Sequence, residues 1–139
     1  MMVAIIDDEF RSIEMIEWLL SMYFEEAKPM MFSNPKEALV AINEKQPPLI
    51  FMDIQMPYMT GFELASQIEQ YNPYIIFITA YNGAILNTLF ENKVPHLLKP
   101  IDHEDFQQKI AQFKNASEIT TRKEMLSILS NKFNEGHFS

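Results

Sequence analysis

The sequence predicts an α/β protein built on a doubly wound sheet of five parallel strands. Three observations support this fold class. Short apolar runs alternate with segments of helical periodicity, most of the runs are apolar throughout, and helix-start signals follow several of them. Continuous apolar strands are typical of parallel sheets that helices cover on both faces. A length of 139 residues and a hydrophobic share of 47% are enough for one such domain with a sizeable core.

Five apolar runs are the expected strands. Residues 74–79 (YIIFIT) carry the strongest signal, because β-branched and aromatic side chains favour extended chain. The run at 94–98 contains Pro95, which has no N–H group, so this strand is expected at an edge of the sheet. The other three expected strands are residues 3–6 (VAII), 29–32 (PMMF) and 49–52 (LIFM).

The segments between these runs carry helical signals. Asn34, Thr60 and Asp102 are placed as N-caps, and the first is followed by Pro35, which suits the first helical position. The expected helices cover residues 10–23, the stretch from 35 to the break at Pro47, residues 61–70, residues 84–91 and the stretch that begins at 103.

The chain is expected to hold one domain and an extension. Residues 1–115 contain all five strand–helix pairs. Residues 116–139 are more polar and contain a helical pattern at 121–133. We therefore expect a domain at 1–115 and a linker with a helical extension at 116–139.

Composition excludes several classes of protein. A net charge of −8 argues against binding of nucleic acid or an anionic membrane surface by this chain itself. The absence of cysteine excludes disulfides and thiolate metal sites. The N-terminus lacks the pattern of a signal peptide, and no apolar run approaches the ~20 residues of a membrane span. A soluble, cytoplasmic protein is expected.

Polar residues stand at the carboxyl ends of four expected strands. The acidic run Asp7-Asp8-Glu9 follows the first strand, Asp53 the third and Lys99 the fifth, while Thr79 ends the fourth. In doubly wound sheets these ends lie along one edge, where ligands bind. Carboxylates that converge there repel one another unless a cation neutralises them, and carboxylate oxygens suit Mg²⁺. The sequence therefore predicts a magnesium site with a lysine and a hydroxyl beside it.

This set of side chains suits phosphoryl transfer. An aspartate carboxylate can act as a nucleophile and form an aspartyl-phosphate. Mg²⁺, Lys99 and Thr79 would neutralise the oxygens of the transferred group. Each residue alone has a simpler explanation: the acids 7–8 as a helix cap, Asp53 as a turn residue and Lys99 as a loop charge. Because these residues occur together at the ends of successive strands, phosphoryl transfer is the favoured interpretation.

Four segments resemble the receiver domain of two-component response regulators. They are "AIIDDE", "IFMDIQMPYMTGFEL", "IIFITAY" and "HLLKPI", in the family's order and at its intervals, over roughly residues 2–114. The resemblance implies the flavodoxin-like (βα)5 receiver fold. It also implies that the chain accepts a phosphoryl group from a sensor histidine kinase. Beyond slow self-dephosphorylation, the resemblance implies that the chain is not an enzyme.

The resemblance assigns roles to the site residues. Asp53 corresponds to the phosphoacceptor, and Asp7 and Asp8 to the acidic pair, with Asp8 the more direct Mg²⁺ ligand. The backbone carbonyl of Gln55 would be a further ligand. Thr79 and Lys99 correspond to the switch hydroxyl and the phosphoryl-binding lysine. Pro57 and Gly61 match the loop that shapes the site. Apart from the resemblance, Tyr81 follows Thr79 and Ala80 and is therefore placed to rim the site.

One position departs from the family pattern. Three residues before the lysine the family usually has an aromatic switch residue, often tyrosine, whereas this chain has His96. Either the histidine is a tolerated surface substitution, or the switch is modified and sensitive to pH, because histidine titrates near neutrality. The output surface is expected on the face formed by residues 84–106, with a homodimer on phosphorylation.

The wording "DIQMP", "TAY" and "LLKPI" is more specifically similar to receivers that precede LytTR-type DNA-binding domains. The resemblance thus implies an output domain after Ser139, through which DNA would be bound and transcription controlled. A stand-alone single-domain regulator is the alternative. Two others are a Mg²⁺-dependent phosphohydrolase that forms an aspartyl-phosphate and a pseudo-receiver that only binds proteins. The hydrolase is disfavoured because Gln55 stands where such enzymes place a second acid.

Overall fold

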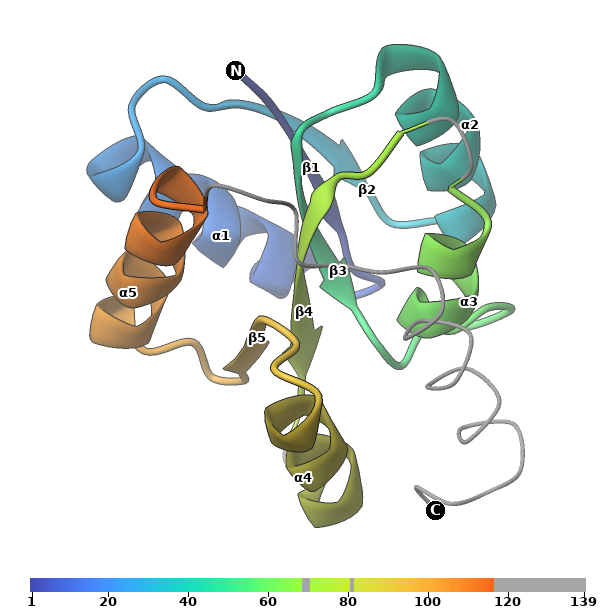
Figure 1. Cartoon of the computed structure of the whole chain (residues 1–139). Helices are drawn as coiled ribbons and strands as arrows, with labels where there is room; N and C mark the ends of the chain where they lie inside the picture. Colours follow the sequence, from blue (N-terminus) through green and yellow to red (C-terminus); the bar gives the residue numbers. More distant parts are fainter. Residues whose placement is uncertain (69–70, 81, 117–139) are drawn as a thin grey trace.

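The computed structural model describes residues 1–68, 71–80 and 82–116, in which strands and helices alternate along the chain (Figure 1). The strands are β1 (Met2–Ile6), β2 (Lys28–Phe32), β3 (Leu49–Asp53), β4 (Tyr74–Thr79) and β5 (His96–Leu98). The helices are α1 (Phe10–Tyr23), α2 (Pro35–Lys45), α3 (Gly61–Ser66), α4 (Gly83–Glu91) and α5 (His103–Lys114). The predicted alternation is confirmed. Tyr81, the predicted helix at 121–133 and nearly all of the extension lie outside the described residues.

The five strands form one parallel sheet in the order β2-β1-β3-β4-β5. β5 lies at an edge, as Pro95 predicts. The strand is shorter than the expected run at 94–98 and begins only at His96. Pro95 has no N–H for the ladder, and it contributes only its carbonyl, which accepts a hydrogen bond from the N–H of Phe77 at 3.0 Å.

Helices cover both faces of the sheet, which explains why the central strands are apolar throughout. Successive strand residues point to opposite faces: Ile50 packs in the core on the side of α2, α3 and α4, whereas Phe51 packs in the core on the side of α1 and α5. Figure 1 shows α1 and α5 on one side of the sheet and α2 and α3 on the other. The predicted two-layered cover of a parallel sheet is therefore confirmed.

Three predicted N-caps are present. Asn34, Thr60 and Asp102 each accept a hydrogen bond from a backbone N–H in the first turn of the helix that follows. α3, however, ends at Ser66 instead of continuing to residue 70. The N–H of Gln67 bonds the carbonyl of Leu64, three residues back, so the helix tightens and stops there.

The order of the strands reverses direction in the middle of the sheet. From β1 the chain crosses to β2 on one side, whereas from β3 it crosses to β4 on the other. The carboxyl ends of the adjacent strands β1 and β3 therefore form the topological switch point, where ligands bind in open α/β sheets. Across the described ranges, no helix has the length and apolar character that crossing a bilayer requires.

Candidate functional site

Two aspartates are held at the switch point by the ends of neighbouring strands. Asp53 is the last residue of β3 and is 4% exposed. The next residue, Ile54, donates its N–H to the carbonyl of Ile78 on β4 at 3.0 Å, which ties the chain after Asp53 to the sheet. Asp7 directly follows β1, is fully buried, and donates its N–H to the carbonyl of Phe32 at 3.1 Å.

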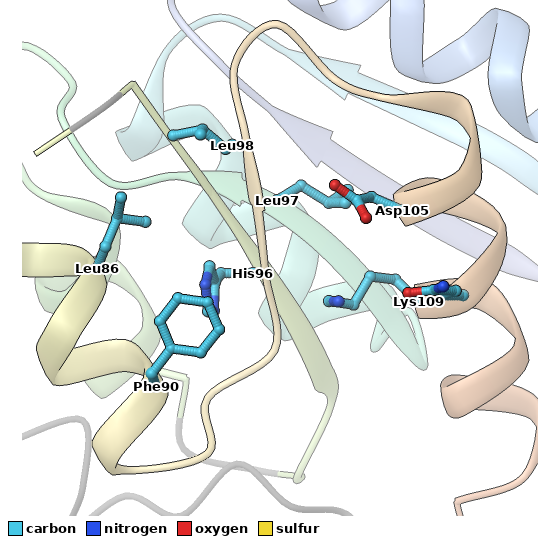
Figure 2. Close-up of a pocket in the computed structure, with 8 residues that line it drawn as sticks. Leu86, Phe90, His96, Leu97, Leu98, Asp105 and Lys109 are labelled. Atoms are coloured by element: carbon cyan, nitrogen blue, oxygen red, sulfur yellow. The ribbon is translucent and has the colours of Figure 1, made fainter. Parts of the chain in front are cut away.

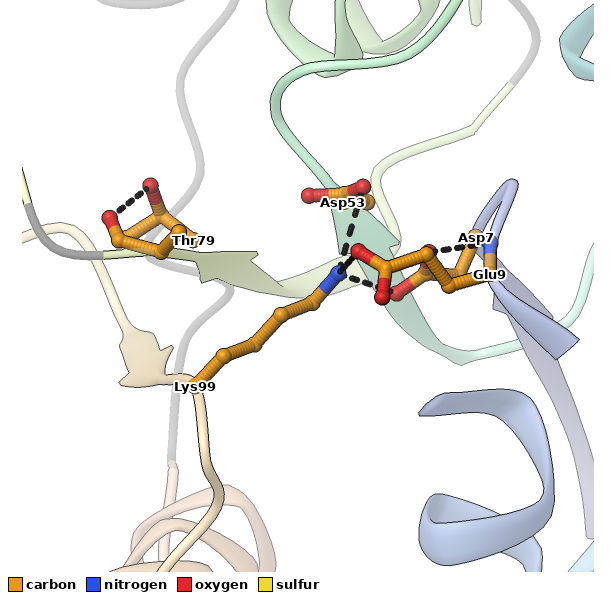
Figure 3. Close-up of polar contacts among 6 residues, drawn as sticks. Asp7, Glu9, Asp53, Thr79 and Lys99 are labelled. Atoms are coloured by element: carbon orange, nitrogen blue, oxygen red, sulfur yellow. Dashed lines mark hydrogen bonds and ion pairs between the residues drawn. The ribbon is translucent and has the colours of Figure 1, made fainter. Parts of the chain in front are cut away.

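Lys99 brings a positive charge to these acids. Its ammonium nitrogen lies 2.9 Å from Asp7 Oδ2, 3.1 Å from Glu9 Oε1 and 3.4 Å from Asp53 Oδ2 (Figure 3). The backbone of Lys99 is fixed as well, because its N–H donates to the carbonyl of Thr79 at 2.8 Å. The lysine thus starts from the end of β5 and spans the sheet edge to the ends of β3 and β1.

The acids form a set that fits a divalent cation. One carboxylate oxygen from each of Asp7, Asp8 and Asp53 lies within 4.8 Å of the others. Among the described residues, the buried Oδ2 of Asp7 has the ammonium of Lys99, at 2.9 Å, as its close polar partner. A buried carboxylate oxygen with a single cationic partner, beside two further carboxylates, is the kind of environment that a hard cation such as Mg²⁺ satisfies.

Burial and like charge alter the ionisation of these groups. Burial, followed by the charge of Asp7, raises the pKa of Asp53 to about 7 even though Lys99 opposes the shift. Burial also raises the pKa of Asp7, against the lowering effect of the Glu9 N–H and of Lys99. For Lys99, burial lowers the pKa, but the bond to Asp7 and the charges of Asp53 and Asp7 outweigh it, and the net pKa is raised.

Thr79 is buried beside the cluster, but its hydroxyl is turned away from it. The hydroxyl donates to the carbonyl of Ala80 at 2.9 Å (Figure 3). In the sheet, Thr79 pairs with Leu98, and Phe77 pairs with His96. Because side chains two residues apart share a face, Thr79 and His96 lie on the same face of β4 and β5.

His96 is half-buried on that face. Its Nδ1 lies 2.8 Å from the carbonyl of Val94, which can only accept, so Nδ1 carries the proton. The ring meets Phe90 of α4 edge-on, with 4.6 Å between the centroids. Burial lowers the pKa of His96, partly offset by the Val94 carbonyl.

The structure therefore brings Asp7, Asp8, Asp53 and Lys99 together, as the sequence predicts. Gln55 lies in the loop that leaves β3, and the ligand role of its carbonyl stays a prediction. One member of the cluster was not predicted from sequence. Glu9 was only part of an acidic run at a helix start, and no local signal distinguishes such a residue from an ordinary solvated acid.

Comparison with known proteins places this arrangement in a family. Residues 3–111 match the response regulator receiver domain. The chain belongs to this family, as the resemblance of its motifs implies, and the fold and the cluster at the strand ends agree with it. It is therefore a receiver domain of a two-component response regulator.

The similar curated proteins are longer response regulators. A response regulatory protein of Vibrio vulnificus is 31% identical over 130 residues, which are 91% of this chain and 52% of that protein. The transcriptional regulatory protein BtsR of Escherichia coli is 30% identical over 113 residues, or 81% of this chain and 47% of that protein. The chain spans about half the length of these two relatives.

Solved structures agree with the fold. The receiver domain of a DNA-binding response regulator from Colwellia psychrerythraea has a TM-score of 0.70 at 21% identity and covers 83% of this chain and 98% of its own. A LuxR-family response regulator from Staphylococcus aureus has a TM-score of 0.69 at 23% identity, with 82% and 98% covered. At these identities the likeness concerns the fold alone.

Proposed function

We propose that this chain is a phosphorylation-controlled switch in which Asp53 accepts a phosphoryl group from a sensor histidine kinase. The observation that carries the proposal is the ammonium of Lys99 within 3.4 Å of the buried carboxylate of Asp53, next to two further aspartates. A buried nucleophile, a cation-binding acid set and a fixed lysine are the parts that phosphoryl transfer to a carboxylate requires.

The residues would divide the work as follows. Asp53 attacks the phosphorus, so that an O–P bond forms while the N–P bond of the donor's phosphohistidine breaks. Asp8 and Asp53, with the carbonyl of Gln55 and support from Asp7, would hold Mg²⁺, which neutralises the oxygens of the transferred group. Lys99 would donate to one of those oxygens. The protein would not be a turnover enzyme.

Thr79 offers the link between this site and the surface. To reach a phosphoryl oxygen, its hydroxyl must leave the carbonyl of Ala80. That movement would change the packing on the face that Thr79 shares with His96. Because His96 contacts Phe90, the change would reach α4 and bias a two-state packing there.

The face formed by residues 84–106 is the proposed output surface. Figure 2 shows a hollow on this face between α4, β5 and α5. Phe90 and Leu98 on this face are exposed, by 69% and 37%. Phosphorylation would strengthen self-association here, and an output domain of the LytTR DNA-binding type would follow in the whole protein. Relatives named as transcriptional regulators support this extension.

Incubation with acetyl phosphate and Mg²⁺ tests the proposed function. The intact mass of the protein should rise by one phosphoryl group and then hold, because Gln55 supplies no acid for rapid hydrolysis. Continuous consumption of the donor without a stable adduct would instead identify a phosphohydrolase. Neither adduct nor consumption would identify a pseudo-receiver, and either result would contradict the proposal.

Mg²⁺ is expected to stabilise the fold because it relieves repulsion among the aspartates. Binding to the folded state alone adds about 2.7 kcal/mol to the free energy of unfolding at a hundredfold excess over the dissociation constant. Thermal melting with millimolar Mg²⁺ and with a chelator measures this gain. Asp8→Ala should remove the gain, whereas Glu14→Ala, which removes an exposed acid of α1, should preserve it. An equal gain in Asp8→Ala would remove Asp8 from the ligand set.

His96→Tyr is expected to separate phosphorylation from its transmission. Phosphoryl uptake should stay within about twofold of the wild type because His96 does not touch Asp53, a change well under 1 kcal/mol. The substitution should change phosphorylation-dependent self-association. Sedimentation with and without beryllofluoride measures this change. Amide exchange should respond at residues 84–106. A response confined to residues 10–45, or a collapse of uptake, would contradict this division of roles.

A further inference from the structure

Glu9 is the N-cap residue of α1, yet its side chain does not cap the helix. The short side chains of serine, threonine, aspartate and asparagine cap helices from this position, and the longer glutamate is not one of the preferred caps. Instead, Oε1 of Glu9 accepts from Lys99 at 3.1 Å, although the Glu9 side chain is 64% exposed and could point into solvent. The two residues are 90 positions apart in the sequence.

The backbone of Glu9 contributes to the same site. Its N–H donates to Oδ1 of Asp7 at 2.8 Å and so orients that carboxylate. The other oxygen of Asp7 is the one that lies 2.9 Å from Lys99. Glu9 therefore acts on Lys99 twice, directly through its carboxylate and indirectly through Asp7.

These contacts bias the position of the ammonium group. Lys99 lies closer to Asp7 and Glu9, at 2.9 and 3.1 Å, than to Asp53, at 3.4 Å. Figure 3 shows the ammonium below Asp53, with Asp7 and Glu9 to its right. In the unmodified protein, part of the hydrogen-bonding capacity of Lys99 is thus directed away from the nucleophile.

We propose that Glu9 is a positioning residue that competes with the incoming phosphoryl group for Lys99 and thereby limits the rate of phosphorylation. The inference rests on the proposed function of Asp53. When acetyl phosphate is the donor, Asp53 forms the new O–P bond and acetate leaves, while Glu9 forms no bond. Lys99 must turn from Glu9 toward the transferred oxygens, and the negative charge of Glu9 also opposes the approach of the anionic donor.

The expected effect is moderate because Glu9 is exposed and water screens its charge. Exposed ion pairs contribute little, so Glu9→Gln should raise the rate constant of phosphoryl uptake by about two- to fivefold. Glutamine keeps the length and shape of the side chain and leaves the backbone N–H to Asp7 unchanged. Glu9→Asp keeps the charge and should stay closer to the wild type than Glu9→Gln.

The experiment compares uptake from acetyl phosphate in five variants by intact mass, two of which are Glu9→Gln and Glu9→Asp. Glu14→Gln is the matched control, since it removes an exposed acid of the same helix. The other two variants are Lys99→Met and the double variant that adds Glu9→Gln to it. A second measurement, calorimetric titration with beryllofluoride and Mg²⁺, reports how readily Lys99 serves the acceptor site without a chemical step. Beryllofluoride should bind about two- to fivefold more tightly to Glu9→Gln than to the wild type.

Competition for Lys99 predicts that Glu9→Gln accelerates uptake more than Glu14→Gln does, and that adding Glu9→Gln to Lys99→Met gives no further acceleration. An equal effect of the two glutamine variants, or an acceleration that persists without Lys99, would overturn the inference while the wild type still takes up a phosphoryl group. If the wild type itself takes up none, the proposed function fails, and this inference fails with it.

Discussion

Asp53→Asn is expected to abolish phosphoryl uptake from acetyl phosphate. The amide is a poor nucleophile and removes a charge that the cation site needs, whereas the position of the side chain at the end of β3 stays the same. Intact-mass measurement after incubation with donor and Mg²⁺ gives the result directly. Asp105→Asn, an exposed aspartate on α5, is the matched control and should take up one group as the wild type does.

The same substitution should stabilise the protein when metal is removed. A folded-state pKa of Asp53 near 7, above its ordinary value of 3.8, means that the folded protein binds this proton more tightly than the unfolded chain does. The contribution of Asp53 to the free energy of unfolding therefore falls as pH rises from about 4 to about 7. Above that range Asp53→Asn should be more stable by an amount on the order of 1–3 kcal/mol.

Denaturant unfolding in the presence of a chelator, at pH 5 and pH 8, checks this sign. The advantage of Asp53→Asn should be larger at pH 8, where the wild-type carboxyl is ionised. Addition of Mg²⁺ should reduce the difference, because the cation neutralises the wild-type site.

The uptake experiment has its own contrary outcome. If Asp53→Asn formed as much phosphoryl adduct as the wild type, another residue would be the acceptor.

Gly61→Ala is expected to damage both the fold and the site. A Cβ atom at Gly61 would overlap the carbonyl oxygen of Asp53 and lie 3.1 Å from the Cα of Ile54. Both neighbours are backbone atoms and cannot turn aside. Since the N–H of Gly61 also donates to the carbonyl of Ile54 at 2.8 Å, the start of α3 must shift against β3. The expected loss of stability is about 2–3 kcal/mol.

Phosphoryl uptake reports the local part of this damage. Because the overlap displaces the backbone of Asp53 itself, uptake should slow even at temperatures where Gly61→Ala is fully folded. Ser66→Ala on the same helix is the control, since it removes only a hydroxyl that bonds the carbonyl of Glu63. Wild-type stability and uptake in Gly61→Ala would show that the close approach of α3 to Asp53 is not required.

Much of the fold could be predicted because its signals are local. The β-branched and aromatic side chains of β4 identify it as a strand. The position before a helical pattern identifies three N-cap residues, Asn34, Thr60 and Asp102. Two ends differed from the prediction by more than one residue, at the close of α3 and the start of β5. Both ends depend on which backbone N–H and C=O groups form hydrogen bonds with each other. Tertiary packing decides this pairing, and the neighbouring residues in the sequence do not.

The sequence by itself determined four residues of the site, since strand ends of a doubly wound sheet converge whatever their side chains are. Asp7, Asp8, Asp53 and Lys99 needed only their positions in the chain to be brought together. The tertiary structure alone decided how they pair. Lys99 has a long, flexible side chain with three acids within 3.4 Å, and the preference for Asp7 and Glu9 over Asp53 depends on the relative placement of β1, β3 and β5. A contact between residues 90 positions apart has no local signature, because it exists only after the strands have assembled.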